Sequence, residues 1–177
     1  MVVDFNDVRV LHLELTTVCN AKCPQCPREN PSLYDKKLDK NELTLGDCKQ
    51  LIDVALIKQL DKLLLCGNFG DPVASQDMIE VCEYFRSINP DITIGINTNG
   101  SLQNIDWWER LGNLLAHNED YCVFSIDGLG DTNSVYRIGT NYDKIIENAT
   151  AFIDAGGSAH WDMLVYEHNQ HQVGDAL

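Results

Sequence analysis

The sequence predicts an α/β fold in which helices cover a parallel β-sheet. Segments with the period of two typical of strands alternate five times with segments of helical period. The strand candidates begin roughly 30–55 residues apart, which leaves room for a helix in each connection. Such alternation implies right-handed βαβ crossovers and strands that all end at one edge of the sheet. Periodicity alone leaves open whether the sheet is doubly wound or part of a barrel.

Five segments have the pattern of strands. In the first, leucines alternate with His12, Glu14 and Thr16, so that a leucine face lies opposite a polar face. In the third, isoleucines alternate with polar or small residues in the same way, and the strand is closed by Asn99 and Gly100. The strand candidates are residues 8–16, 62–66, 92–97, 121–127 and 160–166.

The connections contain helix signals. Thr44 followed by Asp47 is typical of a helix start, and apolar residues then repeat at helical spacing as far as residue 56. We expect Ser75 to cap the second helix and Asn141 to cap the fourth, with a third apolar stripe from Trp107 to Leu115. Residues 32–43 are predicted to form a surface loop, residues 128–140 a long loop, and residues from 171 onward the start of a fifth helix.

Composition bounds the class of protein. The chain has 177 residues, which is the length of one domain, and 13 basic against 27 acidic residues give a net charge of −14. This charge argues against nucleic-acid and membrane-surface partners. We find neither an apolar run of about 20 residues nor a signal peptide, so we expect a cytoplasmic protein. Seven cysteines in such a chain do not indicate a disulfide framework.

Three of the cysteines form a C-x3-C-x2-C pattern directly after the first strand. Cys19, Cys23 and Cys26 lie on a short loop stiffened by proline, so their thiolates can converge on one metal centre. Three thiolates would leave one iron of a [4Fe–4S] cluster open to another ligand, because such a cluster normally takes four. The spacing also fits a zinc site completed by a histidine such as His12, or three unrelated cysteines. The remaining cysteines, at 48, 66, 82 and 122, are expected in the core.

The unusual motifs all follow predicted strands, at residues 19–26, 67–72, 97–100, 125–128 and 166–171. Because parallel strands end at one edge, we expect these segments to form one site. The first of them, in the context LHLELTTVCNAKCPQCPR, resembles the signature of radical S-adenosylmethionine (radical SAM) enzymes. Residues 67–72 resemble the Gly-Gly-Glu-Pro element of that family, and residues 96–100 and 125–128 end their strands in the family manner. Tyr136-Arg137 with Gly139-Thr140 is similar to the branch that carries a C-terminal SPASM domain.

The resemblance covers about residues 8–166 and implies a fold and a chemistry. The fold would be a partial TIM-like (β/α) barrel, with five βα units visible of an expected six. Residues 1–177 would then be one radical SAM core domain, incomplete at its C-terminus and without a SPASM domain. The cofactors would be a [4Fe–4S] cluster and S-adenosylmethionine. Reductive cleavage of S-adenosylmethionine would give a 5′-deoxyadenosyl radical that abstracts hydrogen from a substrate.

The resemblance also assigns residues. Cys19, Cys23 and Cys26 would hold the cluster. The residues expected to bind S-adenosylmethionine are Gly67, Asn68, Phe69, Gly70, Asp71, Asn97, Ser125 and Asp127. Asp71 stands where the family more often has Glu, as the acceptor for the amino group. Gln25 stands where the family has an apolar residue beside the adenine. Arg137 would neutralise a carboxylate or brace a loop, and Glu14 would contact substrate or join a polar network.

The expected partners follow from the same resemblance. The substrate class suggested by the SPASM-bearing relatives is a peptide, and an external electron donor such as a flavodoxin or ferredoxin would reduce the cluster. A separate chain that supplies the missing C-terminal part is a further expected partner. The alternative function is a non-catalytic metal-binding module that holds zinc or a structural cluster and serves in protein interactions.

Overall fold

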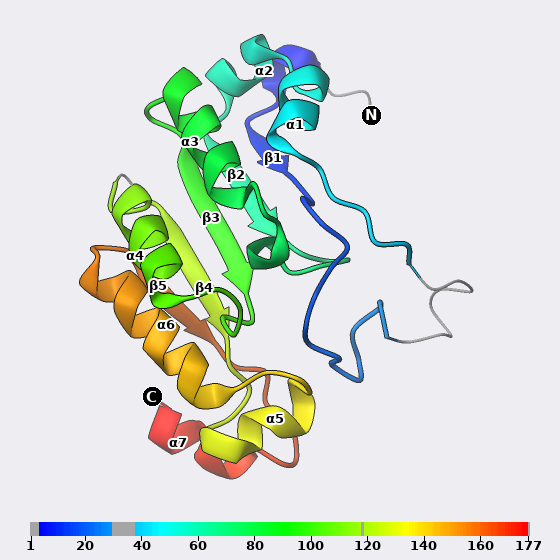
Figure 1. Cartoon of the computed structure of the whole chain (residues 1–177), viewed down its shortest axis with the longest axis vertical. Helices are drawn as coiled ribbons and strands as arrows, with labels where there is room; N and C mark the ends of the chain where they lie inside the picture. The colour runs from blue at the N-terminus through cyan, green and yellow to red at the C-terminus, as the bar shows by residue number, and fades with distance from the viewer. Residues whose placement is uncertain (1–3, 30–37, 118, 177) are drawn as a thin grey trace.

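The computed structural model describes residues 4–29, 38–117 and 119–176, and it contains one five-stranded parallel sheet. Each strand pairs with the next along the chain, in the order β1-β2-β3-β4-β5. This sequential order is that of a barrel segment, because a doubly wound sheet reverses its strand order at a switch point. The α/β class and the partial barrel are therefore confirmed. Within the described residues the sheet stays open, with β1 and β5 at its edges (Figure 1).

The bounds of the elements are as follows. The strands are β1 Val10–His12, β2 Lys62–Cys66, β3 Thr93–Thr98, β4 Tyr121–Ser125 and β5 Ala159–Asp162. The α-helices are α1 Leu45–Leu51, α2 Val54–Gln59, α3 Met78–Ile88, α4 Ile105–Leu114, α5 Asn133–Tyr136, α6 Tyr142–Asp154 and α7 Val173–Ala176. Short 3-10 turns are η1 Phe5–Asp7, η2 Pro72–Ala74, η3 Gly130–Thr132 and η4 Gln170–Gln172. No described helix is long and apolar enough to cross a membrane.

Alternation along the strands separates a core face from an open face. On β2 and β3 every second side chain is fully buried, namely Leu63, Leu65, Ile94 and Ile96. These side chains pack beneath α3 and α4, and Trp108 of α4 lies 5.2 Å from Phe124 of β4, measured between ring centroids. The intervening side chains, such as those of Cys66, Asn97 and Ser125, lie on the opposite face and keep partial exposure. The core face thus anchors the strands, while the other face is available for a site.

The first and last strands are shorter than the sequence predicts. β1 ends at His12, although Leu13 N–H still donates to Leu64 C=O at 2.9 Å and Leu15 remains buried. The chain then turns away, and Thr16 forms an isolated antiparallel bridge with Glu42. β5 ends at Asp162 because the following backbone bonds side chains of the neighbouring loop instead of β4. In the sequence, the strand-like pattern continues beyond His12 and beyond Asp162, so it does not show where the chain leaves the sheet.

Two helix starts are confirmed and two expectations are wrong. Thr44 and Asp47 form a capping box at α1, and the Asn141 side chain accepts from Lys144 N–H at α6. The apolar stripe from residue 45 to 56 is divided into two helices, because Asp53 caps a new helix by accepting from Ala55 N–H. Ser75 does not cap α3; it is buried, and its hydroxyl has no partner in the described structure.

The reason for the Ser75 error lies just before it. Asp71 caps the 3-10 turn η2 by accepting from Val73 N–H, and Pro72 sets the first residue of that turn. The helix α3 is thereby delayed to Met78, after Asp77. The predicted loop at 128–140 likewise contains η3 and α5, and the predicted surface loop at 32–43 falls partly outside the described residues. The fifth helix is confirmed as the short η4 and α7.

Two leucines test the separation of the core face from the surface. Leu65 is 0% exposed in the middle of β2, whereas Leu51 at the end of α1 is 70% exposed. Leu65→Ala should lower the free energy of unfolding by about 2–5 kcal/mol, because it removes buried surface and leaves a cavity. Leu51→Ala should change it by less than about 0.5 kcal/mol. Urea denaturation of both variants measures the difference, and equal losses would contradict the assigned core.

Candidate functional site

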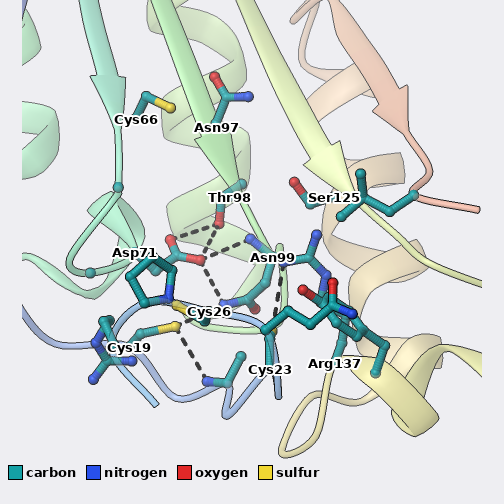
Figure 2. Close-up of a pocket in the computed structure, with 18 residues that line it drawn as sticks. Cys19, Cys23, Cys26, Cys66, Asp71, Asn97, Thr98, Asn99, Ser125 and Arg137 are labelled. Carbon is teal, nitrogen blue, oxygen red and sulfur yellow. Dashed lines mark hydrogen bonds between the residues drawn. The ribbon is translucent and has the colours of Figure 1, made fainter. Parts of the chain in front are cut away.

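A cavity of about 320 Å³ lies at the carboxyl ends of the strands (Figure 2). Its wall is built from the cysteine loop after β1 and from residues at the ends of β2, β3 and β4. Ligand sites of parallel α/β sheets lie at this edge because the loops there vary freely on a rigid frame. The volume is within the range of small-molecule sites. The structure thus brings together segments that are up to 145 residues apart, from Cys19 to Leu164.

The three cysteines of the loop all line this cavity. Cys26 N–H donates to Cys23 C=O at 2.9 Å, which closes the tight turn between them. Cys19 Sγ accepts from Ala21 N–H at 3.3 Å, and Cys23 Sγ lies 3.8 Å from the Arg137 guanidinium. Burial raises the pKa of Cys19 to about 11 and also raises that of Cys23, where Arg137 opposes the shift. The Cys19 and Cys23 thiols are therefore protonated near neutral pH, and a bound metal would have to displace these two protons.

The three thiols are the donor type of an iron–sulfur cluster, and no histidine is among the described residues that line the cavity with them. Among the described residues, no three side chains of His, Cys, Asp or Glu are close enough together to hold one ion. His12, the histidine expected to complete a zinc site, instead places Nε2 at 2.5 Å from Cys66 C=O. Three thiols spread around one cavity are the ligands that an iron–sulfur cluster uses. The zinc alternative therefore has no support in the described geometry.

The loop after β2 owes its two glycines to close backbone packing. A Cβ atom on Gly67 would lie 1.5 Å from Gly70 O, and one on Gly70 would lie 2.0 Å from Thr16 O. Any other residue would force the loop away from itself or from the segment after β1. Both glycines are needed by the chain itself, whatever binds beside them.

Glu14 anchors the tip of the same loop. Its carboxylate accepts from Asn68 N–H and from Asn68 Nδ2, both at 2.8 Å, and from Phe69 N–H at 3.4 Å. Phe69 lines a second, smaller hollow beside residues 14–17. Of the two roles expected for Glu14, the structure supports the polar network.

Asp71 is the acidic residue among those that line the cavity, and 5% of its surface is exposed. Its two carboxylate oxygens accept from Thr98 Oγ1 at 2.8 Å and from Asn99 N–H at 2.8 Å. They also accept from Val73 N–H at 3.0 Å and from Asn99 Nδ2 at 2.6 Å. Burial raises the pKa of this carboxyl, and the donated hydrogen bonds oppose that shift. The loops after β2 and β3 are thus joined through one side chain.

The segment after β4 carries a buried ion pair. Asp127 Oδ2 accepts from Arg137 Nε at 2.6 Å, and Asp127 Oδ1 accepts from Leu164 N–H at 2.7 Å. Asp127 is fully buried behind Arg137, whose guanidinium reaches the cavity. Ser125, two residues earlier on the open face of β4, lines the cavity directly.

Aromatic rings lie next to Gln25. Tyr136 lines the cavity, and its ring centroid is 4.6 Å from that of Tyr166. The Tyr166 hydroxyl donates to Gln25 Oε1 at 3.5 Å. Tyr136 and Tyr166, which are distant from Gln25 in sequence, therefore place an aromatic surface beside this polar side chain.

The residues predicted from sequence are placed in two groups. Those that line the cavity are Cys19, Cys23, Cys26, Gly67, Gly70, Asp71, Asn97 and Ser125. Asn68, Phe69 and Asp127 are not among its lining residues; they bond or pack behind the wall. The prediction that Cys66 belongs to the core is wrong, because Cys66 lines the cavity opposite Asn97. Period two from the buried Leu63 and Leu65 would have put it on the open face.

Thr98 and Asn99 belong to the segment 97–100 expected at the site, and they line the cavity although no ligand role was predicted for them. Only their place directly after Asn97 at the end of a strand signalled them.

An open-edged parallel sheet with three thiols at its carboxyl edge defines a class of metal-binding α/β proteins built on a partial barrel. Residues 13–174 match the model of the Radical SAM superfamily, and the chain belongs to this superfamily of enzymes. Its members bind a [4Fe–4S] cluster and S-adenosylmethionine.

The chain shows low sequence identity to individual proteins of known name. The chain is 32% identical over 91 residues to a probable GTP 3′,8-cyclase of Thermococcus kodakarensis, covering 51% of this chain and 27% of the cyclase. It is 23% identical over 168 residues to the pre-heme d1 synthase of Dinoroseobacter shibae, covering 92% of this chain and 38% of the synthase. The chain thus spans about a third of the length of these relatives.

A solved structure shares the fold. Streptococcus suis SuiB, crystallised with its precursor peptide SuiA, superposes with a TM-score of 0.70 at 18% identity. The match covers 94% of this chain and 35% of SuiB. At this identity the likeness concerns the fold alone, and it agrees with the partial barrel described above.

Two glycines test the packing of the loop after β2. Gly70→Ala should lower the Tm of the chain by several degrees, because its Cβ would lie 2.0 Å from Thr16 O. Gly174→Ala in α7 is the matched control, since a Cβ there meets nothing within 4 Å. Differential scanning fluorimetry compares the two, and an unchanged Tm for Gly70→Ala would contradict the close approach.

Proposed function

We propose that this chain forms the catalytic core domain of a radical SAM enzyme, with Cys19, Cys23 and Cys26 as the three protein ligands of a [4Fe–4S] cluster. The observation that carries the proposal is that all three thiols share one cavity with the loops after β2, β3 and β4. Three protein ligands leave one iron to be bound by S-adenosylmethionine. When bound, the two cofactors supply a radical that removes hydrogen from a substrate.

The chain's own residues orient the ligand and neutralise its charge. Arg137, held by Asp127, presents a fixed positive charge that suits the carboxylate of S-adenosylmethionine. Ser125 and Asn97 offer polar groups on the open face of their strands. Tyr136 supplies the aromatic surface for the adenine that Gln25 lacks. We assign no direct ligand contact to Asp127, since it is fully buried and is not among the residues that line the cavity.

The substrate class we propose is a peptide. The support is the fold shared with SuiB, a protein crystallised with a precursor peptide. The relatives named for GTP and pre-heme d1 chemistry show that one fold serves several substrates. We also propose that an external flavodoxin or ferredoxin reduces the cluster. We propose a cytoplasmic location as well, because the seven free cysteines would persist in a reducing compartment.

Iron analysis tests the cluster ligands. Anaerobically reconstituted protein should bind about four iron and four sulfide per chain. Cys19→Ala, Cys23→Ala or Cys26→Ala should each abolish this binding, because three thiolates are needed together. Cys66→Ala is the control within the same cavity, and Cys82→Ala is the control in the core; both should retain the four irons. Stoichiometric zinc without iron uptake would refute the proposal.

The EPR spectrum of the reduced cluster tests the ligand. S-adenosylmethionine should change this spectrum, because it binds the open iron. Ser125→Ala should weaken the affinity measured by this change by about 1 kcal/mol, the net value of one hydrogen bond. Thr150→Val on α6, which lies away from the cavity, should leave it unchanged. A spectrum that does not respond at saturating ligand would exclude a radical SAM site.

A further inference from the structure

The Asp71 carboxylate has no acceptor position left for an external ligand. Its oxygens accept from Thr98 Oγ1 at 2.8 Å, Val73 N–H at 3.0 Å, Asn99 N–H at 2.8 Å and Asn99 Nδ2 at 2.6 Å. A carboxylate offers about four lone-pair sites. Four donors of the chain therefore saturate it, and only 5% of the residue's surface remains exposed.

This saturation conflicts with the role that the family resemblance assigns to the acid at this position. An acid that accepts from the amino group of S-adenosylmethionine needs a free oxygen facing the cavity. To provide one, Asp71 would have to release Thr98 or Asn99, both of which are themselves buried. Leaving such a donor without a partner costs a free energy of the same order as the new hydrogen bond to a ligand returns, so the exchange brings no clear gain.

The same carboxylate is connected to the cysteine loop. Asp71 N–H donates to Val18 C=O at 2.9 Å, directly before Cys19. Asn99 Nδ2, besides bonding Asp71, donates to Asn20 Oδ1 at 3.0 Å, directly after Cys19. Residues on both sides of Cys19 are thus tied to the Asp71 site. Figure 2 draws the bonds from Asp71 to Thr98 and Asn99 as dashed lines.

Ser101 completes the connection. Asn20 Nδ2 donates to Ser101 Oγ at 2.8 Å, and Ser101 Oγ donates to Asn99 Oδ1 at 2.7 Å. Asn20, Asn99 and Ser101 therefore form a closed ring of hydrogen bonds beside the cysteine loop. These bonds need no cofactor, because every donor and acceptor belongs to the chain.

We propose that Asp71 is a positioning residue and not the acceptor for the amino group of S-adenosylmethionine. Together with Thr98 and Asn99, it joins the loops after β2 and β3 to the cysteine loop. These contacts hold Cys19 in place before a cluster binds. The importance of Cys19 rests on the proposed function. The hydrogen bonds themselves do not, so the two are tested separately.

The first test uses the full chain without a cluster, under reducing conditions. Asp71→Asn and Thr98→Val should each lower the Tm by about 5 °C or more, because each removes a buried hydrogen bond. Thr150→Val is the matched control; this exposed threonine only donates to Ile146 C=O, and its Tm should stay within about 1 °C. The double variant Asp71→Asn with Thr98→Val should lose less than the sum of the single losses, because the two side chains bond each other. Unchanged single-variant Tm values, or strict additivity, would overturn the proposal.

The second test uses Asp71→Glu, which introduces the acid more frequent in the family. A positioning role predicts a lower Tm and slower iron uptake on reconstitution, because the longer side chain cannot keep four hydrogen bonds in a nearly closed site. In the fraction that does hold a cluster, the affinity for S-adenosylmethionine measured by EPR should stay within about twofold of wild type. A normal Tm and normal iron uptake for Asp71→Glu, or a tenfold loss of affinity in Asp71→Asn with an unchanged Tm, would show that Asp71 is the ligand's acceptor. If the wild-type chain takes up no iron, the proposed function fails, while the Tm comparison still decides the role of Asp71.

Discussion

The parallel pairing of β2 with β3 is the constraint on which the site depends. Their register places Cys66 opposite Asn97, so the two strands leave the sheet at the same level and their following loops start side by side. Only then can Asp71, five residues beyond Cys66, reach Thr98 and Asn99. A slip of one residue would turn Asn97 to the helix face and remove these contacts together.

The packed face of the sheet gives the open face its rigidity. Leu63, Leu65, Ile94 and Ile96 are fully buried beneath the helices and hold the strands that carry Cys66 and Asn97. Side chains at strand ends are positioned more accurately than side chains on free loops, because the backbone there cannot shift without disturbing the core. The less regular loops gain order from one another through Asp71, Glu14 and Asp127.

Charge is distributed unevenly around the cavity. The chain carries a net charge of −14, yet Arg28 and Arg137 both lie in the cavity wall. Asp71 and Asp127 add little negative field there, since donors of the chain surround the first and Arg137 pairs with the second. The two arginines can therefore stabilise the thiolates of the cysteine loop and an anionic group of a ligand inside the cavity, although the protein as a whole is acidic.

Sequence alone predicted most of the elements and the edge of the sheet at which the cavity lies. Period two identified the strands, Thr44 and Asn141 marked helix starts, and the spacing of Cys19, Cys23 and Cys26 marked one loop as special, because these signals depend on near neighbours in the chain. The parallel alternation then placed every motif at one edge.

Tertiary structure alone decided which atoms meet there. Asp71 bonds residues 27 and 28 positions away, Asp127 bonds Arg137 and Leu164, and Cys66 turned from expected core residue to cavity wall. No local pattern encodes such partners, since a buried carboxylate takes whichever donors the folded loops bring within reach.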